Sequence, residues 1–356
     1  LNIVQIRDIG DSLCDTYIEY NRETKEFSFQ HDSVETALFV SFGNVYPDVT
    51  LRLCSFRQLS KMCCVKNEWN HLHGQSLTFK IRIDIDQFSV VYERFREGLQ
   101  SGEIESFKNI SEALVWKNYD FLSYFTVKMT CTNDVLQFLS KLDHDGWSLL
   151  VHFINARSTL VVERFVQIIS HCNLEDNNLV TRQLSLASTN ACLADDESIL
   201  NNLMKYHKKV DDFAMLAAAS KGNISILKFL VQRGVDINAT LSIKCRKDLV
   251  NGIKYCRSFP KSPSYHYDIN LFHIACINGK IDMVKYLLVS YPELVHRRSS
   301  AGYTAGHFAA LSENVEIMQL LHGEQKDIID QTMQVQIQPG LDIEAITNYG
   351  YNLIHI

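Results

Sequence analysis

Prolines, tracts of simple composition and long apolar runs are scarce or missing in this sequence. Only 5 of the 356 residues are proline, and no Gly/Ser-rich tract of the kind that forms flexible linkers occurs. No apolar run reaches the roughly 18 residues that a membrane-spanning helix requires. The first residues also lack the charged-then-apolar order of a signal peptide. These absences argue against a membrane or secreted protein and predict a cytoplasmic one.

The motifs of nucleotide hydrolysis and acyl transfer are missing as well. No Gly-x4-Gly-Lys-Ser/Thr phosphate loop and no nucleophile elbow occurs. The carboxylate pair Asp195 and Asp196 lies in a polar turn, where solvation or helix capping explains it. The formal net charge is -6, so no global positive field attracts nucleic acid. We therefore expect a non-catalytic protein without a cofactor.

The 10 cysteines are scattered, mostly in apolar helical stretches such as those around Cys54 and Cys276. This setting is typical of reduced, buried thiols in a cytosolic protein rather than of a disulfide framework. The one local cluster of possible metal ligands consists of Cys63, Cys64, His71 and His73. Zinc sites usually leave about two to four residues between cysteines, so the adjacent pair predicts no metal site.

Internal repetition is the strongest signal in the C-terminal half. Four segments align, at residues 213–234, 270–288, 304–321 and 352–356. They share a turn histidine (His273, His307, His355), a helix alanine (Ala218, Ala275, Ala309) and a glycine after that helix (Gly222, Gly279). These segments resemble ankyrin repeats, with Thr304 on the threonine of that family's Thr-Pro-Leu-His turn. Ala275 and Ala309 are 309 − 275 = 34 residues apart, close to the ankyrin period of about 33.

The physical chemistry of the repeated positions agrees with stacked helix pairs. Small side chains at Ala217–Ala219 let two helices approach closely, and Gly222 permits a left-handed backbone between helices. Apolar residues recur at helical spacing in the second helices, as at Ile226, Leu227 and Leu230. A unit of this size cannot bury its own apolar face, so the units must stack. The sequence thus predicts a mainly α fold with an ankyrin-repeat solenoid at residues 211–356, truncated at its C-terminal end.

Degenerate copies of the repeat are expected over residues 131–210. Leu184–Ala187 lies about one period ahead of Ala218, which places Ala187 at the alanine position. Asp145–Ser148 matches the turn that opens a repeat, with Phe153 at the alanine position. The alternative for this stretch is a plain helical connector.

Two insertions interrupt the predicted repeats, near residues 241–267 and near residues 327–339. Insertions in repeat arrays map to loops on one face, which is often the binding face. The first insertion is basic and aromatic, with Lys244, Arg246 and Lys247 close together. Such a loop fits an acidic or phosphate-bearing partner, and the alternative is a solvated loop without a binding role.

The N-terminal residues 1–55 show a different order of elements. Tyr17–Tyr20 and Glu26–Gln30 have the composition and alternation of strands. Asp32 then opens a helix with Glu35 three residues on, which is the pattern of a capping box. From Asn2 onwards, Ile3, Ile6, Ile9 and Leu13 have the spacing of an amphipathic helix that runs into the first strand. Helix, hairpin, helix is a winged-helix-like arrangement.

This stretch resembles the winged-helix segment of STAND-class, NACHT-like signalling NTPases. The resemblance rests on the Phe-x-His-x-Ser pattern of Phe29, His31 and Ser33. The family usually shows a glutamate five positions after the histidine, where this sequence has Thr36. Residues 56–130 are expected to form a helical connector, because their second half resembles the connector of invertebrate family members.

The resemblance implies a role for His31, because in some family members the matching histidine touches the phosphate of bound ADP. The alternative is a histidine that packs locally at the start of the helix. The chain begins at Leu1 rather than Met, and we interpret it as a piece of a longer polypeptide with a possible NTPase domain upstream. No DNA binding is expected, because Asp32–Phe42 contains no Lys or Arg.

The leading functional hypothesis is a protein-binding, ligand-sensing arm of a STAND-type signalling switch. The runner-up is an ankyrin scaffold or adaptor with no nucleotide switch. Binding is expected at the turn tips, because the helix faces are used in stacking and Tyr and Arg are enriched at binding hot spots. The expected tip residues are Arg297, Arg298, Ser299 and Tyr303 in one unit and Asn348, Tyr349 and Tyr351 in the next.

Overall fold

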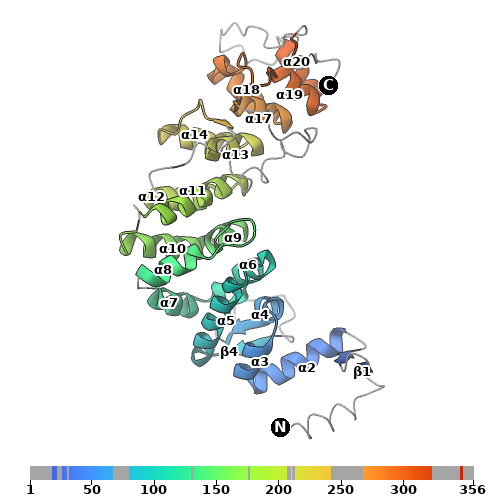
Figure 1. Cartoon of the computed structure of the whole chain (residues 1–356), viewed down its shortest axis with the longest axis vertical. Coiled ribbons are helices and arrows are strands. Elements are labelled where there is room, and N and C mark those ends of the chain that lie inside the picture. Colours follow the sequence, from blue (N-terminus) through green and yellow to red (C-terminus); the bar gives the residue numbers. More distant parts are fainter. Residues whose placement is uncertain are drawn as a thin grey trace. The chain divides into compact units, whose positions relative to one another are not determined.

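A computed structural model describes the greater part of the chain. The described residues are 18–21, 26–29, 32–66, 80–129, 132–174, 177–206, 210, 213–241, 268–322 and 345–347. They are mainly helical, as the sequence predicts (Figure 1). The chain forms two compact units, unit 1 from Leu1 to Lys128 and unit 2 from Met129 to Ile356.

Unit 1 begins with a hairpin of two antiparallel strands, β1 (Ile18–Asn21) and β2 (Glu26–Phe29). Helix α2 (Asp32–Val45) follows. The two strands and the helix start at Asp32 agree with the prediction, and the amphipathic helix predicted from Asn2 onwards lies outside the described residues. Helices α3 (Pro47–Leu53) and α4 (Phe56–Met62) come next.

The stretch after α4 is not purely helical, which corrects the expectation of a helical connector over residues 56–130. Strand β3 (Cys63–Val65) pairs in parallel with β4 (Ile81–Ile83). Each strand has only three residues, too few for alternation of apolar and polar residues to be recognised in the sequence.

The rest of unit 1 is helical and packs around a cluster of aromatic side chains. Its elements are η3 (Ile85–Gln87), α5 (Phe88–Gln100), α6 (Ile104–Ser111), η4 (Leu114–Lys117) and α7 (Tyr119–Lys128). The rings of Phe95 and Trp116 stack with centroids 5.3 Å apart. The Phe121 ring meets Trp116 edge-on at 5.1 Å. Trp116 Nε1 donates to the Ile110 carbonyl at 2.6 Å, so this buried indole has a partner.

Unit 2 starts with α8 (Thr132–Ser140) and continues as helix pairs, which follow one another in chain order in Figure 1. The pairs are α9 (Leu149–Asn155) with α10 (Thr159–His171), α11 (Asn178–Leu193) with α12 (Glu197–Tyr206), α13 (Phe213–Lys221) with α14 (Ile224–Gln232), α17 (Leu271–Ile277) with α18 (Ile281–Ser290), and α19 (Ala305–Leu311) with α20 (Val315–His322). The first helices contact each other in succession, from α9 to α11, α13, α17 and α19. Unit 2 is therefore a solenoid in which each pair packs on its neighbours.

A residue with a left-handed backbone separates the two helices of each of these pairs. These residues are Arg157, Asp195, Gly222, Gly279 and Glu313, with φ between 55° and 80°. The repeated glycines of the sequence thus occupy one conformation, which other residue types adopt only under strain.

The left-handed residue also fixes the register of the repeats. Ala218 and Ala275 lie four positions before it, and so does Phe153 in α9. In α11 the equivalent residue is Ala191, so the sequence-based placement of Ala187 is one helical turn too early. Ala187 and Ala191 are both fully buried on α11, and a shift of four residues keeps the same helix face.

The first insertion leaves and rejoins the solenoid at a pair of short strands. Strand β5 (Thr240–Leu241) is antiparallel to β6 (Ile269–Asn270). This pairing closes the base of the insertion directly before α17. The middle of the insertion and the region of the second insertion near residues 327–339 lie outside the described residues.

We predict that Gly222→Ala destabilises the solenoid by about 1–2 kcal/mol, the cost of a left-handed L-residue. Gly222 has φ +80°, and an added Cβ would lie 3.1 Å from Lys280 Cδ. Gly234→Ala is the matched control, because Gly234 has φ +82° with no atom near its added Cβ. Urea unfolding should show a loss for both variants, with the larger loss at Gly222. An unchanged midpoint for Gly222→Ala would contradict the assigned turn.

Candidate functional site

The turn that opens the α19 pair is held together by backbone and hydroxyl hydrogen bonds. The Ser299 N–H donates to the Tyr303 carbonyl at 2.9 Å, and the Gly302 N–H donates to the Ser299 carbonyl at 2.8 Å. Ser299 Oγ accepts from the Tyr303 N–H at 3.0 Å. Thr304 then caps α19, and its N–H donates to His307 Nδ1 at 3.2 Å. The tip is therefore a rigid platform.

His273 occupies the same place in the preceding repeat, at the third residue of α17. The Asn270 N–H donates to His273 Nδ1 at 3.4 Å, and Asn270 Oδ1 accepts from the His273 N–H at 2.9 Å. His273 Nε2 lies 3.0 Å from the Arg297 carbonyl in the next repeat. Nδ1 accepts and Nε2–H donates, so the ring is the neutral tautomer. The two histidines occupy equivalent turns, as the repeat register predicts.

Burial keeps His273 uncharged. Its side chain is fully buried, and burial lowers its pKa from 6.5 to about 3. The hydrogen bond to the Arg297 carbonyl opposes this shift, while the charge of Arg297 adds to it. A histidine in this state links two repeats and is not available for proton transfer near neutral pH.

The first turn of the solenoid has the same geometry built from different side chains. Asp143 Oδ1 accepts from the N–H groups of Asp145 at 3.0 Å and Trp147 at 2.9 Å. Its Oδ2 lies 2.7 Å from His152 Nε2, and both side chains are buried. Burial raises the pKa of Asp143, but the hydrogen bonds from His152 and from the two N–H groups outweigh it and lower the pKa below its usual value. This pair was not among the predicted site residues, although the Asp-x-x-Gly spacing of the turn is visible in the sequence.

Two of the expected tip residues are not exposed, and that expectation is wrong. Ser299 and Tyr303 are only 5% and 7% exposed. The Ser299 hydroxyl is used inside the turn, and the Tyr303 ring packs on His307 and Phe308, with centroids 5.5 and 5.9 Å away. Both side chains therefore build the platform and do not face a partner.

The two arginines of the same turn differ from each other. Arg297 is half-buried, and its Nη2 donates to Asn238 Oδ1 of the preceding turn at 2.6 Å. Arg298 is exposed. Other exposed side chains on the described turn tips, which the sequence analysis did not single out, are His144, Asp145, Asp236, Asn238, His296 and Ser300. The sequence feature that could have indicated these residues is their position next to the residues that form the turns.

Several predicted site residues lie outside the described part of the chain. They are Lys244, Arg246 and Lys247 in the insertion, Asn348, Tyr349 and Tyr351 near the C-terminal end, and His31 before α2. Their proposed roles stay predictions. The antiparallel pairing of β5 with β6 fixes where the insertion leaves the solenoid.

The candidates for chemistry have structural roles where the structure describes them. Asp196 Oδ1 accepts from the Ile199 N–H at 3.0 Å and caps α12, and Asp195 accepts from Asn223. Cys63 and Cys64 are buried in β3, and burial raises the pKa of the Cys63 thiol. Among the described residues, no group of three or more His, Cys, Asp or Glu side chains is placed to hold a metal ion.

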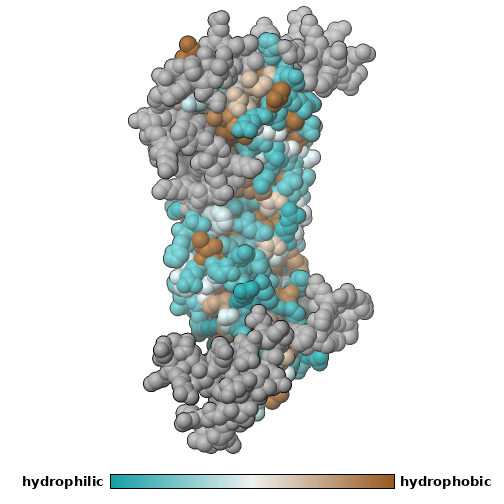
Figure 2. Space-filling model, turned by 90° about the vertical axis from the view of Figure 1, so that its right-hand side faces the viewer, coloured by the Kyte–Doolittle hydropathy of each residue, from teal (hydrophilic) through white to brown (hydrophobic). Residues whose placement is uncertain are grey.

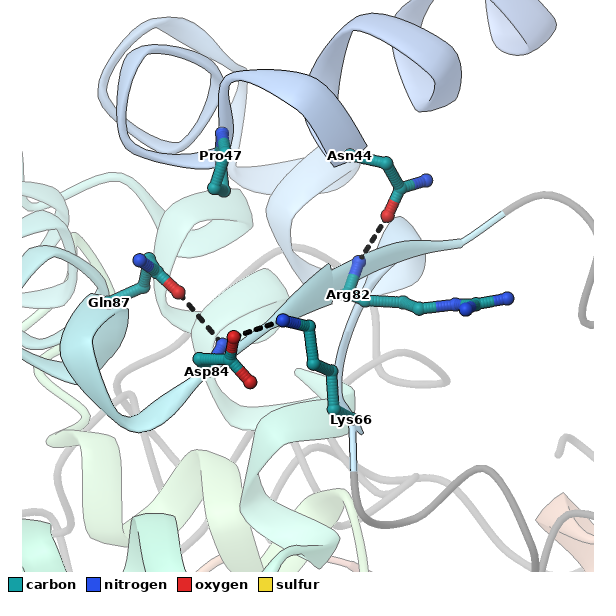
Figure 3. Close-up of a pocket in the computed structure, with 6 residues that line it drawn as sticks. All are labelled: Asn44, Pro47, Lys66, Arg82, Asp84 and Gln87. Atoms are coloured by element: carbon teal, nitrogen blue, oxygen red, sulfur yellow. Dashed lines mark hydrogen bonds and ion pairs between the residues drawn. The ribbon is translucent and has the colours of Figure 1, made fainter.

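Unit 1 contains a polar cleft of about 440 Å³. Figure 3 shows its lining residues, which are Asn44, Pro47, Lys66, Arg82, Asp84 and Gln87. Asn44 Oδ1 accepts from the Arg82 N–H at 2.9 Å, Gln87 Oε1 accepts from the Asp84 N–H at 2.8 Å, and Lys66 forms an ion pair with Asp84. These contacts connect β4 to α2 and to η3, so the polar groups of the cleft serve the fold.

Comparison with known proteins identifies the repeats. A family model for three copies of the ankyrin repeat matches residues 241–332, and a single-repeat model matches residues 213–240. The chain therefore contains ankyrin repeats within residues 213–332. Among solved structures, the human ASB11 ankyrin repeat domain is similar at 13% identity and a TM-score of 0.39, over 73% of this chain and 90% of that one. No curated protein sequence matches the chain.

The described residues on the face seen in Figure 2 are mostly polar. Hydrophilic residues dominate the coloured surface in Figure 2, and hydrophobic ones are scattered among them. No helix among the described residues combines the length and the apolar character that crossing a membrane requires.

We predict that the stability of the chain falls as the pH is lowered from 6.5 towards 4, partly because of His273. Its pKa is about 3 when folded and 6.5 ordinarily, so between these values the unfolded chain binds the additional proton. This one group contributes a slope of up to about 1.4 kcal/mol per pH unit. His273→Gln should reduce that slope in urea unfolding, whereas His144→Gln at an exposed turn should not. Equal slopes in all three proteins would contradict a neutral, buried His273.

Proposed function

We propose that unit 2 is a non-catalytic module that binds a protein partner through the tips of its ankyrin turns. The observation that carries this proposal is the burial of the first helices. Every side chain from Ala214 to Ser220 in α13 and from Leu271 to Ile277 in α17 is buried. The described first helices therefore offer little to a ligand, and the turn tips beside them remain exposed. Ankyrin repeats are protein–protein interaction modules, and they are typically non-catalytic.

The described tips offer both signs of charge on rigid backbones. Asp145 and Asp236 are acidic, and Arg298 is basic. The turn hydrogen bonds hold these positions before a partner arrives, which lowers the entropy lost on binding. The first insertion leaves the solenoid after β5 and returns at β6, and its sequence adds the basic residues Lys244, Arg246 and Lys247. From the charge of this sequence we propose a partner segment that is acidic or carries phosphate.

A finer proposal is that the chain is the sensing arm of a STAND-type switch, with an NTPase domain upstream. Its support is the order of hairpin β1–β2 and helix α2, together with the Phe-x-His-x-Ser pattern around His31. An ankyrin scaffold or adaptor without a switch fits unit 2 equally well. A phosphate loop in a longer form of the protein would favour the switch over the scaffold.

We predict that Lys244→Glu, Arg246→Glu and Lys247→Glu together weaken binding of an acidic or phosphorylated peptide by about tenfold. The reason is electrostatic, so parent binding should also fall when salt is raised from about 50 to 300 mM. Binding is measured on an array of such peptides. The control reverses the same amount of charge at exposed residues of unit 1, with Arg57→Glu, Lys108→Glu and Lys117→Glu. If both triple variants bind like the parent at each salt concentration, the insertion is a solvated loop.

We predict that His31→Ala accelerates ADP release in a longer protein that includes an upstream NTPase domain. The physical reason is the loss of an imidazole hydrogen bond to a phosphate oxygen. Release of a fluorescent ADP analogue by stopped flow measures the effect, and His144→Ala in unit 2 is the control. Equal release rates in all three proteins would favour the scaffold.

A further inference from the structure

Helices α2 and α3 expose a stripe of large apolar side chains. The α2–α3 stripe consists of Leu38, Phe42, Val45, Tyr46, Val49 and Leu53, which are between 42% and 79% exposed. Thirteen large apolar side chains are exposed in the described part of the chain, and six of them lie in these sixteen residues. Scattered apolar residues need no explanation, whereas a contiguous patch indicates an interaction site.

The stripe continues across the junction of the two helices. The Tyr46 N–H donates to the Phe42 carbonyl at 2.8 Å, and the Thr50 N–H donates to the Tyr46 carbonyl at 3.1 Å. The rings of Phe42 and Tyr46 lie 5.1 Å apart. Leu38, Phe42 and Val45 are four and three positions apart, which keeps them on one side of α2. Tyr46, Val49 and Leu53 are three and four positions apart from the start of α3, and Val45 and Tyr46 are adjacent at the junction.

The opposite side of these helices already forms the core of unit 1. Val40 and Leu51 are buried. A Cβ on Gly43 would lie 2.5 Å from Ile81 Cδ1, so α2 packs closely against β4 at this point. The outward face of such a helix is normally polar. Between Glu35 and Val45, the exposed side of α2 carries Glu35 as its only charged residue.

We propose that a second copy of the same chain covers the α2–α3 stripe. The first argument is the charge beside it. Asp48 and Arg52 are exposed and lie one helical turn apart on α3. Neither side chain has a hydrogen-bond or ion-pair partner in the part of the chain that the structure describes. In an antiparallel contact about a two-fold axis, Asp48 of each copy meets Arg52 of the other, so the surface is complementary to itself.

The second argument is the area. Six side chains of this size, each about half exposed, present roughly 600 Å² of apolar surface. Two copies would therefore bury roughly 1,200 Å² in total, which is enough for a specific interface. The near-neutral character of the stripe favours an equally neutral occupant over a strongly charged one.

The test is sedimentation equilibrium of the whole chain from about 1 to 100 μM. We expect a monomer–dimer equilibrium that Val45→Glu weakens by at least about tenfold, because a carboxylate would be buried in the contact. Val315→Glu is the matched control, since Val315 is 68% exposed and Val45 is 66% exposed. This control should dimerise like the parent. Circular dichroism and the melting temperature verify that both variants fold.

A charge exchange tests the pairing itself. Asp48→Arg should weaken the dimer several-fold, because it places like charges opposite each other twice. Adding Arg52→Asp to that variant should restore the dimer by exchanging the two signs. Failure of the double variant to recover would overturn the antiparallel pairing.

A photo-activated cross-linker at position 42 identifies the occupant. We expect a product of twice the chain mass. A parent that stays monomeric over the whole concentration range would overturn the proposal, and so would a dimer that Val45→Glu leaves unchanged. A cross-link within one chain, for example to residues 1–17, would assign the stripe to the chain's own N-terminal segment and would equally overturn it.

Discussion

The complete burial of the first helices is the constraint on which the rest of the solenoid depends. All seven side chains of α17 are buried, and one partner helix cannot enclose a helix on every side. Neighbouring repeats must therefore cover the remaining faces. Close approach requires small side chains, which explains the run Ala217–Ala219 in α13. It also explains why each pair turns sharply through a left-handed residue, since a longer connection would separate the two helices.

Burial of this extent removes several polar side chains at the helix starts from water, and most such buried groups are hydrogen-bonded inside a protein. His273 meets this demand in the neutral state, between the Asn270 N–H and the Arg297 carbonyl. The first turn meets it with the charged side chain of Asp143, stabilised by two N–H groups and by His152. The same turn geometry is thus formed by different side chains in different repeats. The first repeat is therefore difficult to recognise from its sequence.

The later repeats could be predicted from the sequence more reliably than the first ones. The later repeats were recognisable because they carry the residue types that the repeat favours, Gly222 and Gly279 at the left-handed position and His273 and His307 at the third residue of the first helix. In the first two pairs the left-handed position is occupied by Arg157 and Asp195 instead of glycine. No glycine therefore marked the register there, and Ala187 was placed one helical turn too early. The burial of Ser299 and Tyr303 was not predictable from composition. A tyrosine and a serine in a polar turn are equally compatible with packing inside the turn and with an exposed binding surface. The three-residue strands β3 and β4 are too short to leave a pattern.

The pairing of β5 with β6 fixes the two ends of the first insertion, whereas the length and sequence of the insertion between them can vary. Asn270 is both the last residue of β6 and the cap of α17. The chain therefore returns to the same point of the repeat whatever lies between Leu241 and Ile269. The cost of lengthening a loop with fixed ends grows only slowly with its length. A basic insertion between β5 and β6 is therefore compatible with the packing of the buried helices. That packing places no demand on the charge of the insertion, so binding of a partner can determine it.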